Sequence, residues 1–194
     1  MRFEILPGLP PYGPTAISFT MNGAREHREG LVVRFYPAAS ELWIGNFIEG
    51  DTACNVVFDH PNGTWVIVVA QGGVCFVDPE RPTVIGRMAG DVTQVISVPL
   101  LGLIVFQCST DFIAMGADNS GWHSPRISWD GFRNIEVHGT ELLGEAYSPV
   151  SDAWAPFRLD LLTGHCTDGI YEKEMSRAVL VSHGRKTKID PSLN

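Results

Sequence analysis

Three stretches of the chain share one pattern: a short apolar strand, a polar turn and a second strand that carries an aromatic residue. They are WVIVVAQGGVCFVD from Trp65, LIVFQCSTDFIAMG from Leu103 and LLGEAYSPVSDAWAPFRLD from Leu142, so they start 38 and 39 residues apart. A fixed period of roughly 20–50 residues is the sequence signature of stacked or radially arranged sheet units. The pattern therefore constrains the architecture and leaves the chemistry open.

The chain from Leu31 to about residue 170 alternates short apolar segments with turns. The segments are rich in Val, Ile, Phe and Trp, which favour strands, and Gly, Pro, Asn and Asp stand between them. We therefore predict an all-β fold of antiparallel β-meander units, because the gaps between segments have hairpin length. A propeller-like set of units, a β-sandwich and an irregular barrel all satisfy this pattern, and we favour the first.

The two ends of the chain differ from this β-rich body. Residues 1–15 hold four prolines and two glycines, which exclude a helix or a central strand and predict an extended arm. Residues 171–194 hold five Lys or Arg against three Asp or Glu, and we expect this basic tail to be partly disordered. Since 194 residues suit one domain, we predict a single all-β domain over residues 1–170.

Charge and hydropathy indicate which kinds of partner the protein binds and in which compartment it is found. Residues 1–170 hold 9 Lys or Arg and 19 Asp or Glu, so the body repels nucleic acid and attracts a basic protein. The longest apolar run, Val95 to Phe106, is broken by Pro99 and Gly102, so we expect no membrane association. The first residues lack the basic flank and apolar core of a signal peptide, which predicts a cytoplasmic protein.

Local signatures of catalysis are missing from the sequence. The spacing of cysteines and histidines includes no CxxC, HxH or HxxxH pair, so we predict no metal and no cofactor. No GxSxG elbow or GxxxxGK[ST] phosphate loop occurs. Asp59-His60 and Asp111 are candidate acid/base groups, but Asp59 precedes a PNG turn, and turn formation is its favoured role. We assign no catalytic residue.

One segment, GWHSPRISWDGFRNI at residues 121–135, concentrates two tryptophans, two arginines, a histidine and an aspartate. The alternation of Ile127 and Trp129 predicts a strand over residues 126–129, and Asp130 with Gly131 predicts a turn. A structural role would make Trp129 a core residue, Asp130 a turn residue and Arg126 a partner of a carboxylate. A functional role would place the segment at a binding surface, because Trp and Arg are enriched at binding hot spots. The predicted binding residues are Trp122, His123, Arg126, Trp129 and Asp130.

This segment resembles a W-x-S-x-R-I-S-W-D-G motif of a group of uncharacterised small bacterial proteins. In that group, as here, the motif is followed by a segment similar to GEAYSPVSDAWAPFRLDLLTG. The resemblance covers roughly residues 60–170 and implies a β-rich bacterial protein. It implies no activity.

Taken together, the acidic body, the scattered tryptophans and the missing catalytic signatures favour a binding module over an enzyme. The leading hypothesis is a non-enzymatic bacterial protein that binds another protein, in its most concrete form an acidic, immunity-type partner that neutralises a basic toxin. The alternative is a hydrolase or lyase whose Asp, Glu or His residues come together from distant parts of the sequence. A third hypothesis is a structural subunit. The sequence leaves the oligomeric state open.

Overall fold

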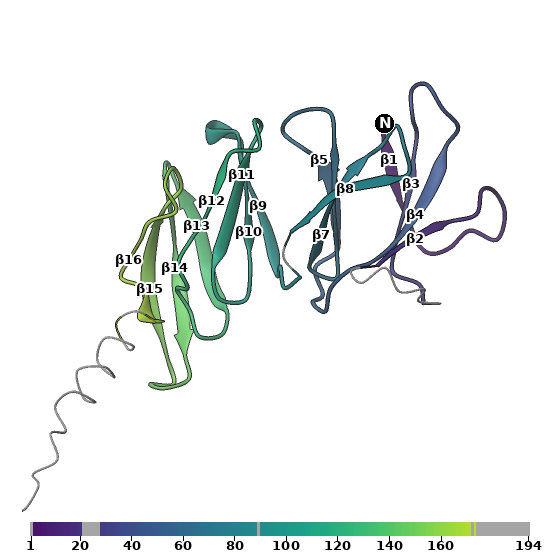
Figure 1. The fold of residues 1–194 in the computed structure, drawn as a ribbon. Helices are drawn as coiled ribbons and strands as arrows, with labels where there is room; N and C mark the ends of the chain where they lie inside the picture. The colour runs from purple at the N-terminus through teal and green to yellow at the C-terminus, as the bar shows by residue number, and fades with distance from the viewer. Residues whose placement is uncertain (1, 21–27, 89, 172, 174–194) are drawn as a thin grey trace, which may run out of the picture. The chain divides into compact units, whose positions relative to one another are not determined.

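The computed structural model describes residues 2–20, 28–88, 90–171 and 173 (Figure 1). Its sixteen described strands and one short 3-10 helix, η1 (Pro99–Leu101), confirm the all-β prediction. Ile170, Tyr171 and Lys173 have helical backbone, and the remainder of the tail that we expect to be partly disordered lies outside the described residues. In the described ranges, no helix has the length and apolar character needed to span a membrane.

The chain divides into two compact units, Met1–His123 and Ser124–Asn194, and each is described by itself. A single domain over residues 1–170 stays a prediction. The first unit contains three four-stranded sheets, which we name A, B and C in chain order. Their strands are β1 (Phe3–Leu6), β2 (Ile17–Thr20), β3 (Leu31–Phe35) and β4 (Trp43–Ile48) in sheet A; β5 (Val56–Asp59), β6 (Val66–Ala70), β7 (Gly73–Asp78) and β8 (Thr83–Met88) in sheet B; and β9 (Gln94–Val98), β10 (Leu103–Gln107), β11 (Phe112–Gly116) and β12 (Gly121–His123) in sheet C.

The second unit contains one sheet, named sheet D. Its strands are β13 (Phe132–His138), β14 (Glu141–Ser148), β15 (Ala153–Asp160) and β16 (Cys166–Thr167). Sheets B, C and D are antiparallel meanders in which the strands lie in chain order. The three sequence repeats are their central hairpins, because β6, β10 and β14 start at Val66, Leu103 and Glu141. The described strands thus form four separate meander-sized sheets rather than the two sheets of a sandwich.

Sheet A departs from the meander order. Its strands lie in the order β1-β3-β4-β2, and β2 runs parallel to β4. The arm therefore supplies one edge strand, β1, and the proline-rich loop that leads to the other edge strand, β2. The prolines lie in this loop, where no strand partner requires their backbone. Arg2, just before β1, also donates hydrogen bonds to Asp59 at 2.9 Å and to the Gly63 carbonyl at 3.0 Å, both in or beside sheet B.

Sheet B lies between sheets A and C, and its side chains alternate between the two. All five residues of β6 are buried. Val66, Val68 and Ala70 pack in one cluster with Phe35 and Phe47 of sheet A, while other residues of sheet B pack against sheet C. This second cluster contains Ile67, Val69, Val74, Phe76, Ile104 and Phe106. A strand buried on both faces requires a continuous apolar run, and VIVVA supplies it.

The turn between β6 and β7 joins the connections that enter and leave sheet B. The Thr52 N–H donates to the Gln71 carbonyl at 2.7 Å, and the Val92 N–H donates to the Gly72 carbonyl at 3.1 Å. A side chain at Gly73 would place its Cβ 2.5 Å from the Cβ of Glu49. Glycine is therefore required here because two chain segments approach too closely for any side chain.

Replacing Phe47 tests how much the contact between sheets A and B contributes to the stability of the first unit. Its ring is fully buried and stacks on Phe19 with the ring centroids 5.0 Å apart. We expect Phe47→Ala to lower the free energy of unfolding by about 3–5 kcal/mol, measured by chemical denaturation. Leu100→Ala, at a side chain that is 92% exposed, should change it by less than about 0.5 kcal/mol. Equal effects would contradict the packing described above.

Candidate functional site

The distinctive segment at residues 121–135 is divided between the two units. Trp122 and His123 lie on β12 of the first unit, whereas Arg126, Trp129 and Asp130 lie in the second unit, before β13. The strand predicted over residues 126–129 is wrong, because residues 124–128 have irregular backbone. The turn predicted at Asp130 and Gly131 is confirmed by a bend there and by a φ of 84° at Gly131.

The backbone around residues 126–129 is held by the Ser128 hydroxyl, and not by the strand pairing that the alternation of Ile127 and Trp129 predicts. This hydroxyl is fully buried and accepts hydrogen bonds from the N–H groups of Asp130 at 3.2 Å and Tyr147 at 3.1 Å. Its single proton faces the carbonyls of Gly131 at 2.6 Å and Tyr147 at 3.1 Å. A side chain that serves several backbone groups at once fixes the bend without a ladder of strand hydrogen bonds.

Arg126, Trp129 and Tyr171 form what we call the Trp129 cluster. The Arg126 guanidinium donates hydrogen bonds to the carbonyls of Ser128 at 3.0 Å and Trp129 at 2.9 Å. Its carbon lies 4.7 Å from the ring centroid of Tyr171 and 5.4 Å from that of Trp129. Arg126 therefore stabilises the bend through backbone carbonyls and aromatic rings, and the predicted binding residue Trp129 is half-buried within this cluster.

A second cluster lies on one face of sheet D, and we call it the Trp154 cluster: Arg133, Glu145, Tyr147 and Trp154. Trp154 pairs with Tyr147 across β14 and β15 with the ring centroids 5.1 Å apart, and the Arg133 guanidinium lies 4.5 Å from its ring. Arg133 Nε donates to Glu145 at 2.8 Å. Hydrogen bonds from Arg133 and then from Asn134 lower the pKa of Glu145 below its usual value.

Sequence reasoning missed the Trp154 cluster, although two signals pointed to it. In a strand, Glu145 and Tyr147 share a face. The turn SPVSD would then place Trp154 opposite Tyr147 in the returning strand. The two clusters meet at Tyr147, whose carbonyl accepts the N–H of Trp129 at 3.1 Å.

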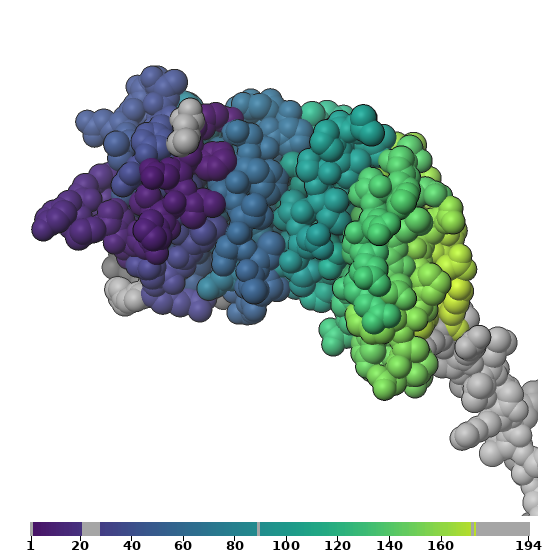
Figure 2. All heavy atoms as spheres, turned by 180° about the vertical axis from the view of Figure 1, so that it is seen from behind, coloured from purple at the N-terminus to yellow at the C-terminus, as the bar shows by residue number. Residues whose placement is uncertain are grey.

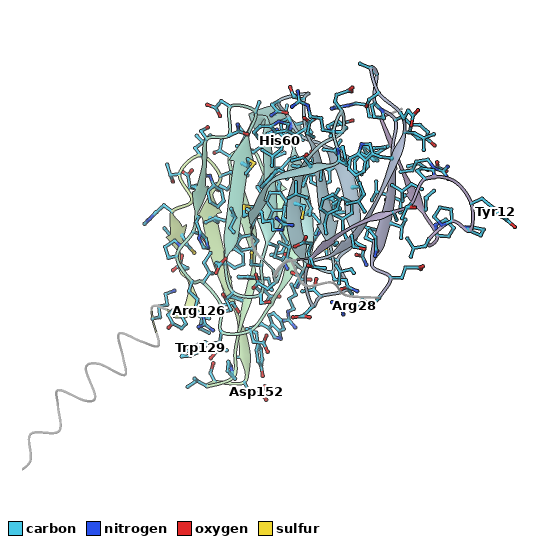
Figure 3. All side chains as sticks on the ribbon, turned by 45° about the vertical axis from the view of Figure 1, so that its right-hand side comes forward. Tyr12, Arg28, His60, Arg126, Trp129 and Asp152 are labelled. Carbon is cyan, nitrogen blue, oxygen red and sulfur yellow. The ribbon has the colours of Figure 1, made fainter. Side chains whose placement is uncertain are left out.

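The tip of the β14–β15 hairpin extends beyond the Trp154 cluster. Val150 at this tip is 71% exposed, and the Tyr147 hydroxyl donates to Asp152 at 2.9 Å. This hydrogen bond to the carboxylate raises the pKa of Tyr147. Figure 3 shows Arg126, Trp129 and Asp152 toward the same end of sheet D. The second unit thus presents two tryptophans, two arginines and an exposed aliphatic side chain at one end.

In the first unit, His123 pairs with a residue that sequence analysis considered separately. His123 Nε2 lies 3.0 Å from Asp111 Oδ1, and the Thr110 hydroxyl donates to Asp111 Oδ2 at 3.1 Å. A carboxylate that holds an imidazole in this way fixes its orientation, as in general-base sites. Trp122, on the same strand, pairs with Ala114 and is half-buried.

The other candidate acid/base residues, Asp59 and His60, have two different structural roles. Asp59 forms an ion pair with Arg2 at 2.9 Å. The turn that follows is held by His60 and Asn62, since the Asn62 N–H donates to His60 Nδ1 at 3.0 Å. His60 is only 1% exposed, and its burial lowers its pKa. Among the described residues, no group of three or more His, Cys, Asp or Glu is arranged to hold a metal.

Replacing Ser128 tests whether its hydroxyl holds the bend. Ser128→Ala leaves the buried N–H groups without their acceptor, so we expect the free energy of unfolding to fall by about 1–3 kcal/mol. The amide of Tyr147 should exchange its hydrogen faster. Chemical denaturation and hydrogen exchange by NMR measure both effects. Ser151→Ala, at an exposed serine, is the matched control. An unchanged exchange rate at Tyr147 would assign the bend to other contacts.

His60 makes the stability of the first unit depend on pH. Because its pKa is lower in the folded state than in the unfolded state, the unfolded state takes up the proton first as the pH falls below about 6.5. We therefore expect the free energy of unfolding to decline below about pH 6.5 until the folded-state pKa is reached. His60→Gln should reduce this decline in denaturation curves measured at several pH values.

Comparison with known proteins adds little to this geometry. No protein-family model matches the chain. No curated protein matches it either. A crystal structure of a eukaryotic initiation factor is 13% identical with a TM-score of 0.39, over 72% of this chain and 39% of that one. A crystal structure of puromycin hydrolase is 17% identical with a TM-score of 0.41, over 72% of this chain and 24% of that one. The chain spans less than half of either structure, and likeness this slight carries no argument about its function.

Proposed function

We propose that this protein is a non-enzymatic module that binds another protein through the hairpin end of its second unit. The observation that carries the proposal is the arrangement of Trp154, Tyr147 and Val150, which are aromatic or exposed aliphatic side chains beside the charged residues Arg133 and Asp152. Binding hot spots have this composition, with tryptophan, tyrosine and arginine at the centre and polar residues that exclude water around them. The stacked Arg133 also holds the Trp154 ring in place before a partner arrives, which reduces the entropy lost on binding.

The charge of the chain supports a basic partner. The formal net charge is −8 at pH 7, so long-range attraction would speed the encounter with a cationic protein. An immunity-type role, in which this acidic protein neutralises a basic toxin, is the most concrete form of the proposal. The same charge disfavours nucleic acid as a partner. The location we propose is the bacterial cytoplasm, where the four free cysteines would remain reduced.

The alternative function, a hydrolase or lyase, has one observation in its favour. Asp111, just before β11, and His123, at the end of β12, form a carboxylate–imidazole pair beside sheet C. This pair could orient a general base. We rank it second because, within the part of the chain that the structure describes, the carboxyl groups whose pKa departs clearly from its usual value, Glu4, Asp118, Glu145 and Asp168, are all shifted downward. A lowered pKa keeps a carboxylate ionised, whereas a general acid needs a raised one.

Val150→Arg tests the binding proposal without altering the core. Val150 is 71% exposed at the hairpin tip, so the variant should fold normally while a new cation and a bulky side chain obstruct a basic partner. We expect capture of the partner to fall at least about tenfold. The measurement is cross-linking in the cell that encodes the chain, followed by purification and quantitative mass spectrometry.

Leu162→Arg is the matched control. Leu162 is 61% exposed in the same unit, beyond the opposite end of β15, and the substitution changes the charge equally. It should retain the partner, and added salt should weaken capture by both the wild type and this variant. The proposal fails if the wild type captures no specific basic protein, or if the two variants behave alike.

A further inference from the structure

The first unit carries an uncharged hollow between sheets B and C that the proposed function does not use. Its volume is about 250 Å3, and its lining residues are Trp65, Phe76, Ile85, Gly86, Met115 and Asn119. The hollow exists because Gly86 pairs with Phe76 in the register of β7 and β8, so no side chain covers that part of the Phe76 ring. A Cβ at Gly86 would lie 3.6 Å from Phe76 Cδ2, in ordinary contact.

His60 packs against three of the residues that line this hollow. Its ring contacts Trp65 and Phe76 with centroid distances of 5.4 and 5.9 Å, and its Nε2 lies 3.1 Å from the sulfur of Met115. Since His60 Nδ1 accepts the Asn62 N–H, Nε2 carries the proton and faces the Met115 sulfur, which is a weak acceptor. The hollow is therefore a shallow, mostly apolar recess whose lining residues His60 supports, and its volume is below the roughly 300–1,000 Å3 typical of small-molecule sites.

The same unit carries an uncharged projection. Residues 7–16 connect β1 and β2, which lie at opposite edges of sheet A, so this segment must pass around the sheet. Tyr12 is 89% exposed in this segment. Figure 2 shows the segment in purple reaching away from the rest of sheet A, and Figure 3 shows Tyr12 at its tip.

The loop that holds Tyr12 is restrained by its sequence. Four prolines fix φ within residues 7–14, and Gly13 supplies a φ of 108° that other residues rarely adopt. The base of the loop is tied to Glu29, whose carboxylate accepts the Leu9 N–H at 3.0 Å. A restrained loop loses little entropy when it docks, so Tyr12 is suited to insert into a recess.

We propose that Tyr12 of one copy of this chain inserts into the hollow of a second copy. The loop cannot fill the hollow of its own chain, because sheet A packs on one face of sheet B and the hollow opens beside Phe76 and Met115, on the face toward sheet C. The hollow exceeds the 150 Å3 of a cavity known to admit benzene, so it has room for one aromatic ring.

Charge favours this pair of surfaces for contact between copies. Each copy has a net charge of −8 and repels the other. Residues 5–18 contain no charged side chain, and none of the six lining residues is charged. Neutral surfaces are therefore where two such copies can touch at the least electrostatic cost, and salt should strengthen the contact by screening the remaining repulsion.

The proposed contact between copies is weak because the area that it buries is small. An aromatic side chain buries about 150–250 Å2, far less than the roughly 1,200 Å2 of a stable interface. The contact is also heterologous, since the loop of one copy meets the hollow of the next, and such contacts extend into chains unless they close. We therefore expect reversible association that grows with protein concentration.

Sedimentation velocity of the full chain over a range of concentrations tests the proposal. The weight-average mass should rise with concentration, and more steeply in about 0.3 M NaCl than in low salt. Tyr12→Ala should lower the association constant about tenfold or more, while Tyr12→Phe, which keeps the ring, should retain most of it. Gly86→Val should also lower it by filling the hollow. Leu100→Ala removes an exposed apolar side chain elsewhere in the unit and should change nothing.

A soluble competitor supplies the second measurement. p-Cresol, the side-chain analogue of tyrosine, should reduce the association of the wild type. A monomeric wild type at every concentration overturns the proposal, and so does association that Tyr12→Ala leaves unchanged. Binding of p-cresol without an effect of Tyr12→Ala also overturns it, because the hollow would then accept rings other than Tyr12. Salt weakens the binding of a basic partner and strengthens self-association, so the two proposals can fail separately.

Discussion

The first unit depends on a hairpin that is buried on both faces. All residues of β6 and the residues of β7 up to Val77 are buried, and alternate residues pack against sheet A and sheet C. Neither neighbouring sheet could retain its cluster without this hairpin, because each cluster draws about half its members from sheet B. The turn at Gln71 and Gly72 strengthens the arrangement, since the connections before and after the sheet both bond to it. The continuous run VIVVA is therefore the segment of the first unit with the least tolerance for polar substitution.

The repeat spacing predicted this architecture well because it reflects a physical requirement. Each four-stranded meander needs the same number of residues to form its strands and turns, so the central hairpins recur at a nearly fixed distance. The same reasoning could not predict sheet A, whose edge strands lie on either side of the proline-rich loop at residues 7–16 and whose β2 runs parallel to β4. Pairing between segments more than twenty residues apart leaves no local periodicity in the sequence.

The candidate site was predicted less completely. Residues 126–129 have the alternation of a strand, but alternation alone does not reveal that the Ser128 hydroxyl binds the backbone of residues 130, 131 and 147. Trp129 and Arg126 were found because their residue types are conspicuous. Trp154 and Arg133 were missed as a pair because their contact depends on the register of β14 with both of its neighbours. The Asp111–His123 pair likewise follows from the pairing of β11 with β12, which the sequence of either strand does not encode.

The position of the arm in sheet A bears on the order in which the chain folds. Both edges of the β3–β4 hairpin are covered by residues that leave the ribosome before the hairpin itself. Strands β1 and β2 therefore have no partner at first and must wait until residues 31–48 have been synthesised. Once they pair, the same short segment covers both edges against unwanted strand addition. The edge strands of sheet A thus precede in sequence the central hairpin on which their own pairing depends.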